Sequence, residues 1–306
     1  MPKRDFEELR ERMLKSAKQG ITDAYKSEEY ALMQAVNAQI ETSRSYNLAF
    51  ERLSEWYGIY YPEVRIASPV TLAKLALVLN TSGIDKREIE EAVGDAEKAE
   101  EVYAKAQKTI GRPMEGDESK AVMGFSKMVI ALSTSLEELD AYIKLAAKRI
   151  LPNTTYLTDH MIAAELLSRA GSMERLATMP AGTVQLLGAE KALFKHIKFG
   201  SRPPKYGILF KLPEVTNGQR EIRGRIARVY ATKICIALKA DYFSKNFIAE
   251  KLKKDLEESI RKIKEKPIVP KPEQPRQDFR RRDFNNRGRG FSGDRGKRRD
   301  FGKGRR

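Results

Sequence analysis

Residues 122–150 decide the fold of this chain, and they read VMGFSKMVIALSTSLEELDAYIKLAAKRI. Apolar side chains recur along this stretch in alternating steps of three and four residues. That alternation is the heptad spacing of a helix that packs along one seam. The seam positions are Val122, Phe125, Val129, Leu132, Leu136, Leu139, Ile143, Ala146 and Ile150. The stretch therefore predicts one long helix with a single packed face.

A second apolar series with the same alternation precedes the first. It consists mostly of small residues, which are Ile89, Ala92, Ala96, Ala99, Tyr103, Ala106 and Ile110. Between the two series, Gly111, Pro113 and Gly116 form a turn through which neither helix can continue. We therefore predict an antiparallel coiled-coil hairpin within residues 66–151.

The outer face of the predicted hairpin carries further apolar residues, including Met128, Tyr142 and Leu145. Apolar surface of this kind favours self-association. We expect a homodimer formed through the hairpin, with a dimerisation seam of Val122, Phe125, Val129, Leu132, Leu136, Leu139 and Ile143. The alternative is a monomer in which the hairpin packs on the chain's own N-terminal helices.

The rest of the chain is also helical in pattern, so the predicted class is all-α. Residues 1–65 are interpreted as an N-terminal helical segment. Residues 152–265 are interpreted as a compact helical domain whose last helix runs from Arg223 into the 260s. Residues 266–306 are expected to be a disordered, basic Pro-rich spacer and Arg/Gly-rich tail. Within residues 276–306, thirteen Lys or Arg residues against four Asp leave a net charge of +9.

The composition favours a polyanionic partner. The net charge is +16 over 306 residues, and cations that neutralise phosphates gain affinity from counterion release. No apolar run is long enough to span a bilayer. One cysteine and two histidines provide neither a disulfide nor a Cys/His metal site. The chain also lacks a nucleotide-binding fingerprint and an evident nucleophile, so we expect no enzyme activity and no cofactor.

Residues 188–207, which read GAEKALFKHIKFGSRPPKYG, are the stretch best suited to gripping a phosphate backbone. Gly188 opens a helix whose first N–H groups attract phosphate oxygens, and a basic loop stiffened by prolines follows. The candidate RNA-binding residues are Gly188, Ala189, Glu190, Lys191, Ala192, Leu193, Phe194, Lys195, His196, Lys198, Arg202, Lys205, Arg220, Arg223, Arg225 and Arg228.

Several of these candidates have more than one interpretation. Leu193 and Phe194 are residues usually found in a core, with exposure of Phe194 as the alternative. Glu190 is suited either to accepting a hydrogen bond from a base or to pairing with Lys191. His196 is suited either to a hydrogen bond with RNA or to a structural role.

Six motifs of the chain resemble the Nop domain. They are PNT at 152–154, AGSMERL at 170–176, MPAGTVQLLGAEKALF at 179–194, RPPKYG at 202–207, RGRIAR at 223–228 and DYFS at 241–244. The resemblance covers residues 48–265 and is most specific at 188–194. Within the Nop-domain family, it points to the archaeal core proteins of box C/D small ribonucleoproteins, which guide ribose 2′-O-methylation of RNA.

The resemblance implies a dimerising coiled coil joined to a Nop domain. That domain would dock on a kink-turn of the box C/D guide RNA already held by a small kink-turn-binding protein. Methyl transfer would belong to fibrillarin and its S-adenosylmethionine, with no catalytic residue or metal in this chain. Such proteins bind fibrillarin through an additional N-terminal α/β domain, and the residues before Pro62 are too few for it, so direct binding is left open.

The resemblance also leaves the biological setting open. It implies a cytoplasmic location in an archaeal cell and a nucleolar one in a eukaryotic cell. Two alternatives to the methylation scaffold are a splicing-type Nop-domain protein and a general nucleic-acid-coating protein that binds mainly through its tail.

Overall fold

The computed structural model describes residues 3–79 and 85–265, and within these residues every regular element is helical. The helices are α1 (Lys3–Tyr25), α2 (Glu28–Tyr57), α3 (Pro69–Val78), α4 (Lys86–Val93), α5 (Ala96–Gln107), α6 (Gly116–Ile150), α7 (Pro152–Leu157), α8 (His160–Ala170), α9 (Met173–Thr178), α10 (Ala181–Leu186), α11 (Glu190–Phe199), α12 (Pro213–Thr216), α13 (Arg223–Lys239) and α14 (Ala249–Glu265). A 3-10 turn, η1 (Ile208–Lys211), and a π turn, η2 (Ala240–Ser244), complete them. The all-α prediction is confirmed for the described residues, and the predicted disordered tail, 266–306, lies outside them.

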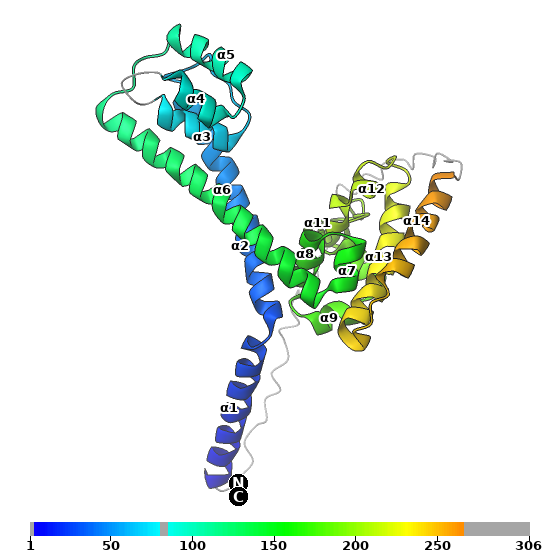
Figure 1. Ribbon diagram of the computed structural model, residues 1–306. Coiled ribbons are helices and arrows are strands. Elements are labelled where there is room, and N and C mark those ends of the chain that lie inside the picture. The colour runs from blue at the N-terminus through cyan, green and yellow to red at the C-terminus, as the bar shows by residue number, and fades with distance from the viewer. Residues whose placement is uncertain (1–2, 80–84, 266–306) are drawn as a thin grey trace, which may run out of the picture.

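Helices α2 and α6 form a long antiparallel stalk (Figure 1). At one end, Arg149 Nε donates to Glu28 Oε2 over 3.2 Å. Near the other end, the rings of Trp56 and Phe125 lie 6.2 Å apart, and the Tyr60 hydroxyl donates to Glu118 Oε2 over 3.0 Å. Residue numbers therefore rise along α2 as they fall along α6, which defines the antiparallel register.

The prediction that residues 89–110 form the second arm of the hairpin is wrong. This segment is divided into α4 and α5 by Gly94, which adopts a left-handed conformation with φ of 71°. Asp95 then caps α5 by accepting from the backbone N–H groups of Glu97 and Lys98. A glycine in the left-handed region ends a helix. The series of small residues from Ile89 to Ile110 is therefore divided between two helices. The partner of α6 is α2, which lies outside the predicted hairpin.

The predicted seam of α6 is used within the chain. Val122, Val129 and Ile143 are fully buried, while Phe125, Leu132, Leu136 and Leu139 are half-buried. This is the packing of the monomer alternative, in which the seam meets an N-terminal helix. The homodimer stays a prediction, as do the domain boundaries at 65, 151 and 265.

Two hydrophobic cores lie at opposite ends of the stalk (Figure 1). One core gathers α3, α4 and α5 around the ends of α2 and α6, with Tyr57 and Tyr60 buried among them. The other core is the helical body formed by α7 to α10 and α12 to α14, into which α2 inserts Leu32 and Val36. Helix α13 runs through the centre of the body, where Ile226, Ile234 and Leu238 are fully buried.

The prediction of one helix from Arg223 into the 260s is also wrong. Helix α13 ends at Lys239, passes into the π turn η2, and is followed by Lys245 with φ of 54°. The break places the Asp241 carboxylate against the start of α7. There it accepts hydrogen bonds from Asn153 N and Nδ2 at 2.9 and 2.8 Å, and from Thr154 N and Oγ1 at 3.0 and 2.8 Å.

Candidate RNA-binding interface

Residues 188–207 leave the body and return to it through a closed neck. The backbone N–H of Gly207 donates to Gln185 O over 3.0 Å, and that of Ile208 donates to Leu187 O over 2.7 Å. The side-chain amide of Gln185, which is buried, donates to Lys205 O over 2.6 Å. These three hydrogen bonds hold the two ends of the excursion side by side, so its orientation on the body is fixed.

Glycine is required at both sides of this neck. A Cβ at Gly207 would lie 1.8 Å from the carbonyl oxygen of Leu187, which is part of the backbone and cannot move aside. Gly188 has φ of 85°, and a Cβ there would lie 2.7 Å from Cγ1 of Ile208. From the sequence, we expected Gly188 to open a helix that attracts phosphate. The structure shows that Gly188 is also needed for folding, because glycine adopts this positive φ without strain.

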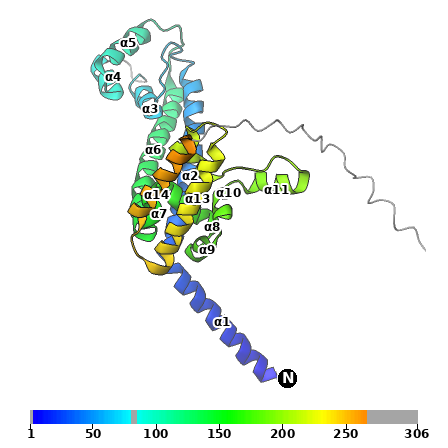
Figure 2. The same cartoon turned by 90° about the vertical axis from the view of Figure 1, so that its right-hand side faces the viewer.

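Helix α11 projects from the body into solvent (Figure 2). None of its residues is buried, and the cations Lys191, Lys195 and Lys198 are all exposed. Phe194 is 67% exposed, so its interpretation as a core residue is wrong. Leu193 is half-buried, as is Ala189, which precedes the helix without a side-chain cap, and Ala192 is exposed. A helix that presents both cations and large apolar side chains is unusual for a solvated surface.

Sequence reasoning did not include Ile197 and Phe199, which lie on the same helix and are 70% and 63% exposed. Their apolar character gave no signal, because large apolar residues are most often buried. The usable signal was the scarcity of polar positions across residues 192–199, where only Lys195, His196 and Lys198 are polar.

Glu190 and His196 both hold the excursion itself together. The Glu190 carboxylate accepts from the backbone N–H of Gly188 over 2.6 Å, which differs from both predicted contacts. The His196 ring bonds through Nδ1 to the carbonyl oxygen of Ser201. Because a carbonyl only accepts, Nδ1 carries the proton in this contact. Both side chains therefore have structural roles in the free chain.

Two stacked aromatic rings lie at the end of the basic loop. Tyr206 and Phe210 are stacked with centroids 4.8 Å apart and planes within 10°. The Arg223 guanidinium lies 5.7 Å from the Phe210 ring centre, and its Nε donates to Gly218 O over 2.8 Å. Arg223 is thus fixed in place by the body. The stacking of Tyr206 on Phe210 was not predicted from the sequence, since it depends on the closed neck.

The basic loop meets the start of α13. The side chain of Lys205 lies along Gly224, with its Cδ 3.6 Å from where a Cβ would be. Around this contact, Arg202, Arg220 and Arg228 are exposed and Arg225 is half-buried. The first turn of α13 contains no acidic residue and no side-chain cap. Cations beside an uncapped helix start produce a strongly positive surface that suits an anion.

The candidate cations have no carboxylate partner among the described residues. The ion pairs of the body instead engage other lysines, such as Lys211 with Glu165 and Lys233 with Asp255. None of the ion pairs among the described residues includes Lys191, Lys195, Arg202, Lys205, Arg220, Arg225 or Arg228. Lys198 is also absent from them, and its Nζ lies 5.4 Å from the centre of the Phe199 ring. We call this set, on α11, the loop and the start of α13, the unpaired basic surface.

Residues 3–79 and 85–265 have neither a metal-binding cluster nor a membrane-spanning helix. Those residues contain no group of three His, Cys, Asp or Glu side chains placed to hold a metal ion. Within the same ranges, no helix combines the length and apolar character needed to cross a membrane. His160 has a structural contact, because its ring bonds to Asp140 Oδ1 at 2.9 Å and to Asp159 Oδ1 at 2.8 Å.

An all-helical body with an unpaired basic surface is suited to binding a polyanion. Comparison with known families makes the assignment narrower. Residues 38–262 match the Nop family, described as "snoRNA binding domain, fibrillarin". The chain therefore belongs to the Nop family, and the resemblance seen in its motifs is confirmed.

Individual relatives come from archaea and eukaryotes. An uncharacterized NOP5 family protein of Methanocaldococcus jannaschii is 30% identical over 269 residues, which cover 86% of this chain and 64% of the relative. Nucleolar protein 56 of Dictyostelium discoideum is 38% identical over 222 residues, covering 70% of this chain and 41% of the relative. Nucleolar protein 56 of Homo sapiens is 31% identical over 240 residues, covering 75% and 40%. The chain thus spans between about two fifths and two thirds of the length of these relatives.

A solved structure titled as a fibrillarin/Nop5p complex contains a chain similar to this one. The two share 24% sequence identity with a TM-score of 0.47, over 86% of this chain and 80% of the other. That score is too low to establish a common overall fold.

Proposed function

We propose that this chain is a non-catalytic RNA-binding scaffold of box C/D guide ribonucleoproteins, which direct ribose 2′-O-methylation of rRNA or tRNA. The observation that carries the proposal is the unpaired basic surface, held on a fixed neck within a Nop-family domain. Cations without carboxylate partners are free to neutralise phosphates, and binding would release the counterions of the RNA.

The two kinds of side chain on α11 suit a composite target. Lys191, Lys195 and Lys198 match a phosphate backbone, whereas Phe194 and Ile197 match a base or an apolar protein surface. A kink-turn of the guide RNA together with its small kink-turn-binding protein would offer both. We therefore propose that the chain recognises the assembled complex more strongly than RNA alone.

The methylation reaction belongs to a partner in this proposal. The family description names fibrillarin, and fibrillarin would supply S-adenosylmethionine chemistry while this chain holds the RNA. The absence of a cofactor from this chain stays a prediction. So does its location, which would be cytoplasmic in an archaeal cell and nucleolar in a eukaryotic one.

The proposal is tested by measuring binding to three probes across a series of salt concentrations. The probes are a kink-turn RNA bound to its kink-turn-binding protein, the same RNA alone, and a plain RNA duplex of equal charge. We expect the first to bind most tightly. In Lys191→Ala, the slope of log affinity against log salt for this probe should fall in magnitude by about one, as expected for the loss of one phosphate contact.

Lys127→Ala is the matched control, since Lys127 is exposed on the stalk and its loss changes net charge equally. It should leave the salt slope unchanged. Equal affinity for the plain duplex would contradict the scaffold and favour the coating protein. Identical slopes for the two variants would remove Lys191 from the interface.

A further inference from the structure

Helix α1 stands apart from the rest of the molecule. It extends beyond the end of the stalk (Figures 1 and 2) and meets the rest of the described chain at the start of α2. Phe6, Leu9, Met13, Leu14 and Ile21 are all exposed, Phe6 by 69% and Met13 by 65%. Their spacing places them along one side of the helix. Helices in proteins gain most of their stability from tertiary packing of such an apolar side.

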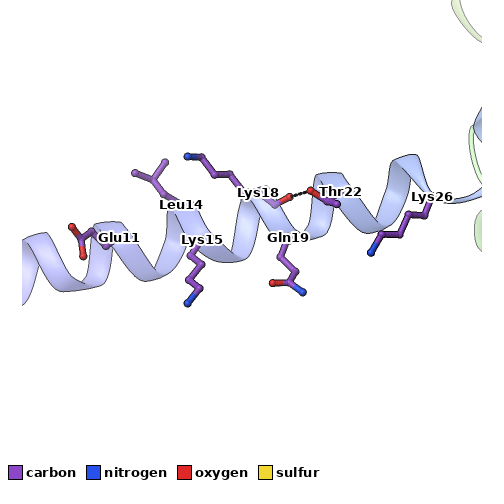
Figure 3. Close-up of a pocket in the computed structure, with 7 residues that line it drawn as sticks. All are labelled: Glu11, Leu14, Lys15, Lys18, Gln19, Thr22 and Lys26. Atoms are coloured by element: carbon purple, nitrogen blue, oxygen red, sulfur yellow. Dashed lines mark hydrogen bonds between the residues drawn. The ribbon is translucent and has the colours of Figure 1, made fainter.

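The apolar side of α1 is a shallow groove with a charged edge. Its lining consists of Phe6, Leu9, Arg10, Met13, Leu14 and Ala17, so one cation lies among the apolar side chains. Figure 3 shows Leu14 and Lys18 on one side of the helix, with Lys15 and Gln19 pointing to the other. Lys18 therefore flanks the apolar side, and Gln19 faces away from it.

We propose that α1 binds the α1 helix of a second copy of this chain, as an antiparallel pair around a two-fold axis near Met13. The charges on α1 suit this arrangement. Glu7 and Lys18 are eleven residues apart, which is about three helical turns, so both lie along the same edge of the groove. An axis midway between them sets Glu7 of each copy opposite Lys18 of the partner subunit.

The apolar residues obey the same axis. Leu9 and Ala17 lie four residues before and after Met13, so a large side chain of one copy faces a small one of the other. Phe6 likewise faces the Gly20 and Ile21 region. An isologous interface requires this self-complementarity, because each patch must fit itself. This surface is separate from the outer face of α6, through which the sequence predicted a dimer.

Crosslinking tests the location of the pairing on the helix. In the full chain with Cys235→Ser, Met13→Cys should form a covalent dimer with a short bismaleimide. Gln19→Cys, on the opposite side and about 18 Å from its symmetry mate along the pair, should not. Equal crosslinking at both positions, or none at Met13→Cys, would overturn the proposal. The absence of crosslinking at Met13→Cys would indicate that α1 binds a different protein.

Charge exchange provides an independent test by sedimentation equilibrium. Glu7→Lys and Lys18→Glu should each weaken self-association roughly tenfold, since each places two like-charge pairs in the interface. The double variant Glu7→Lys/Lys18→Glu restores both pairs and should return the affinity to within about threefold of the parent. Failure of this rescue would contradict the antiparallel register.

Met13→Glu and Gln19→Glu form a matched pair with the same change in charge. Met13→Glu should abolish the α1 contact, and Gln19→Glu should leave it intact. Because α1 lies outside both cores, each variant should retain the thermal unfolding midpoint of the body. Unchanged self-association in Met13→Glu would refute the pairing, whatever the outcome of the RNA-binding experiments.

Discussion

At the residue scale, Gly207 holds the neck of the excursion closed. It lies where the excursion returns to the body, with its amide bonded to Gln185 O. A side chain here would collide with the Leu187 carbonyl, and that carbonyl also accepts from Ile208. One methyl group would therefore disturb two of the hydrogen bonds that close the neck.

Gly207→Ala should lower the free energy of unfolding by about 3 kcal/mol, because the backbone must shift to admit the Cβ. Chemical denaturation followed by circular dichroism measures this change. Gly182→Ala is the control, since nothing lies within 4 Å of a Cβ at that helical position. It should be neutral or stabilise by up to about 1 kcal/mol. Equal stability of the two variants would show that the neck is not rigid.

Asp241 ties the end of α13 to the start of α7 with its buried carboxylate. Asp241→Ala should cost about 3 kcal/mol or more, because the donors of Asn153 and Thr154 would be left buried without an acceptor. Asp159→Ala removes an exposed helix cap instead and should cost about 1 kcal/mol. The urea midpoints of the two variants measure these losses of stability. An equal loss in both variants would argue against a special role for Asp241.

At the element scale, the contact between α6 and α8 predicts a dependence on pH. The hydrogen bond from His160 on α8 lowers the pKa of Asp140 on α6 below its ordinary value. A carboxylate with a lowered pKa in the folded state stabilises the fold above its unfolded pKa of about 3.9. That contribution is lost as the pH falls through the lower folded value.

Asp140→Asn should therefore be less stable than the parent at pH 7, with the difference shrinking below about pH 4. Thermal unfolding at pH 7 and pH 3 measures this change. Glu137→Gln, an exposed position on the same helix, should show no such pH-dependent difference. A constant difference between Asp140→Asn and the parent at both pH values would contradict the coupling.

At the scale of the whole molecule, the stalk joins two cores, and the unpaired basic surface lies on only one of them. The net charge is also unevenly distributed along the sequence, since residues 276–306 carry +9 of the total +16. Selective and non-selective binding should therefore be separable. The folded body would recognise shape, and the tail would add affinity that depends on salt.

Deleting residues 276–306 should weaken binding to every RNA and reduce the salt slope, while the preference for the kink-turn complex over plain duplex persists. Binding titrations at several salt concentrations measure both effects. Replacing Phe279, Phe284, Phe291 and Phe301 by Ser keeps the tail's charge and should leave the salt slope nearly unchanged. Loss of all selectivity upon deletion would instead support the coating protein.

Sequence reasoning was most accurate where local spacing decides structure. The long helix predicted over residues 122–150 from its heptad spacing is observed as α6, which begins six residues earlier at Gly116. The glycines at 188 and 207 marked the ends of the excursion. The prediction from sequence was wrong where a distant segment competes for the same face of a helix. Both α2 and residues 89–110 carried suitable apolar residues, and the choice of α2 depends on packing across the whole chain.

The sequence by itself determined the all-helical class, the basic character and the Nop family membership, because periodicity, charge and motifs are properties of neighbouring residues. Only the tertiary structure decided that α2 pairs with α6, that Asp241 binds the start of α7, and that Phe194 faces solvent. These outcomes depend on which surfaces meet after the chain has folded. An apolar side chain is exposed or buried according to what the rest of the molecule places against it.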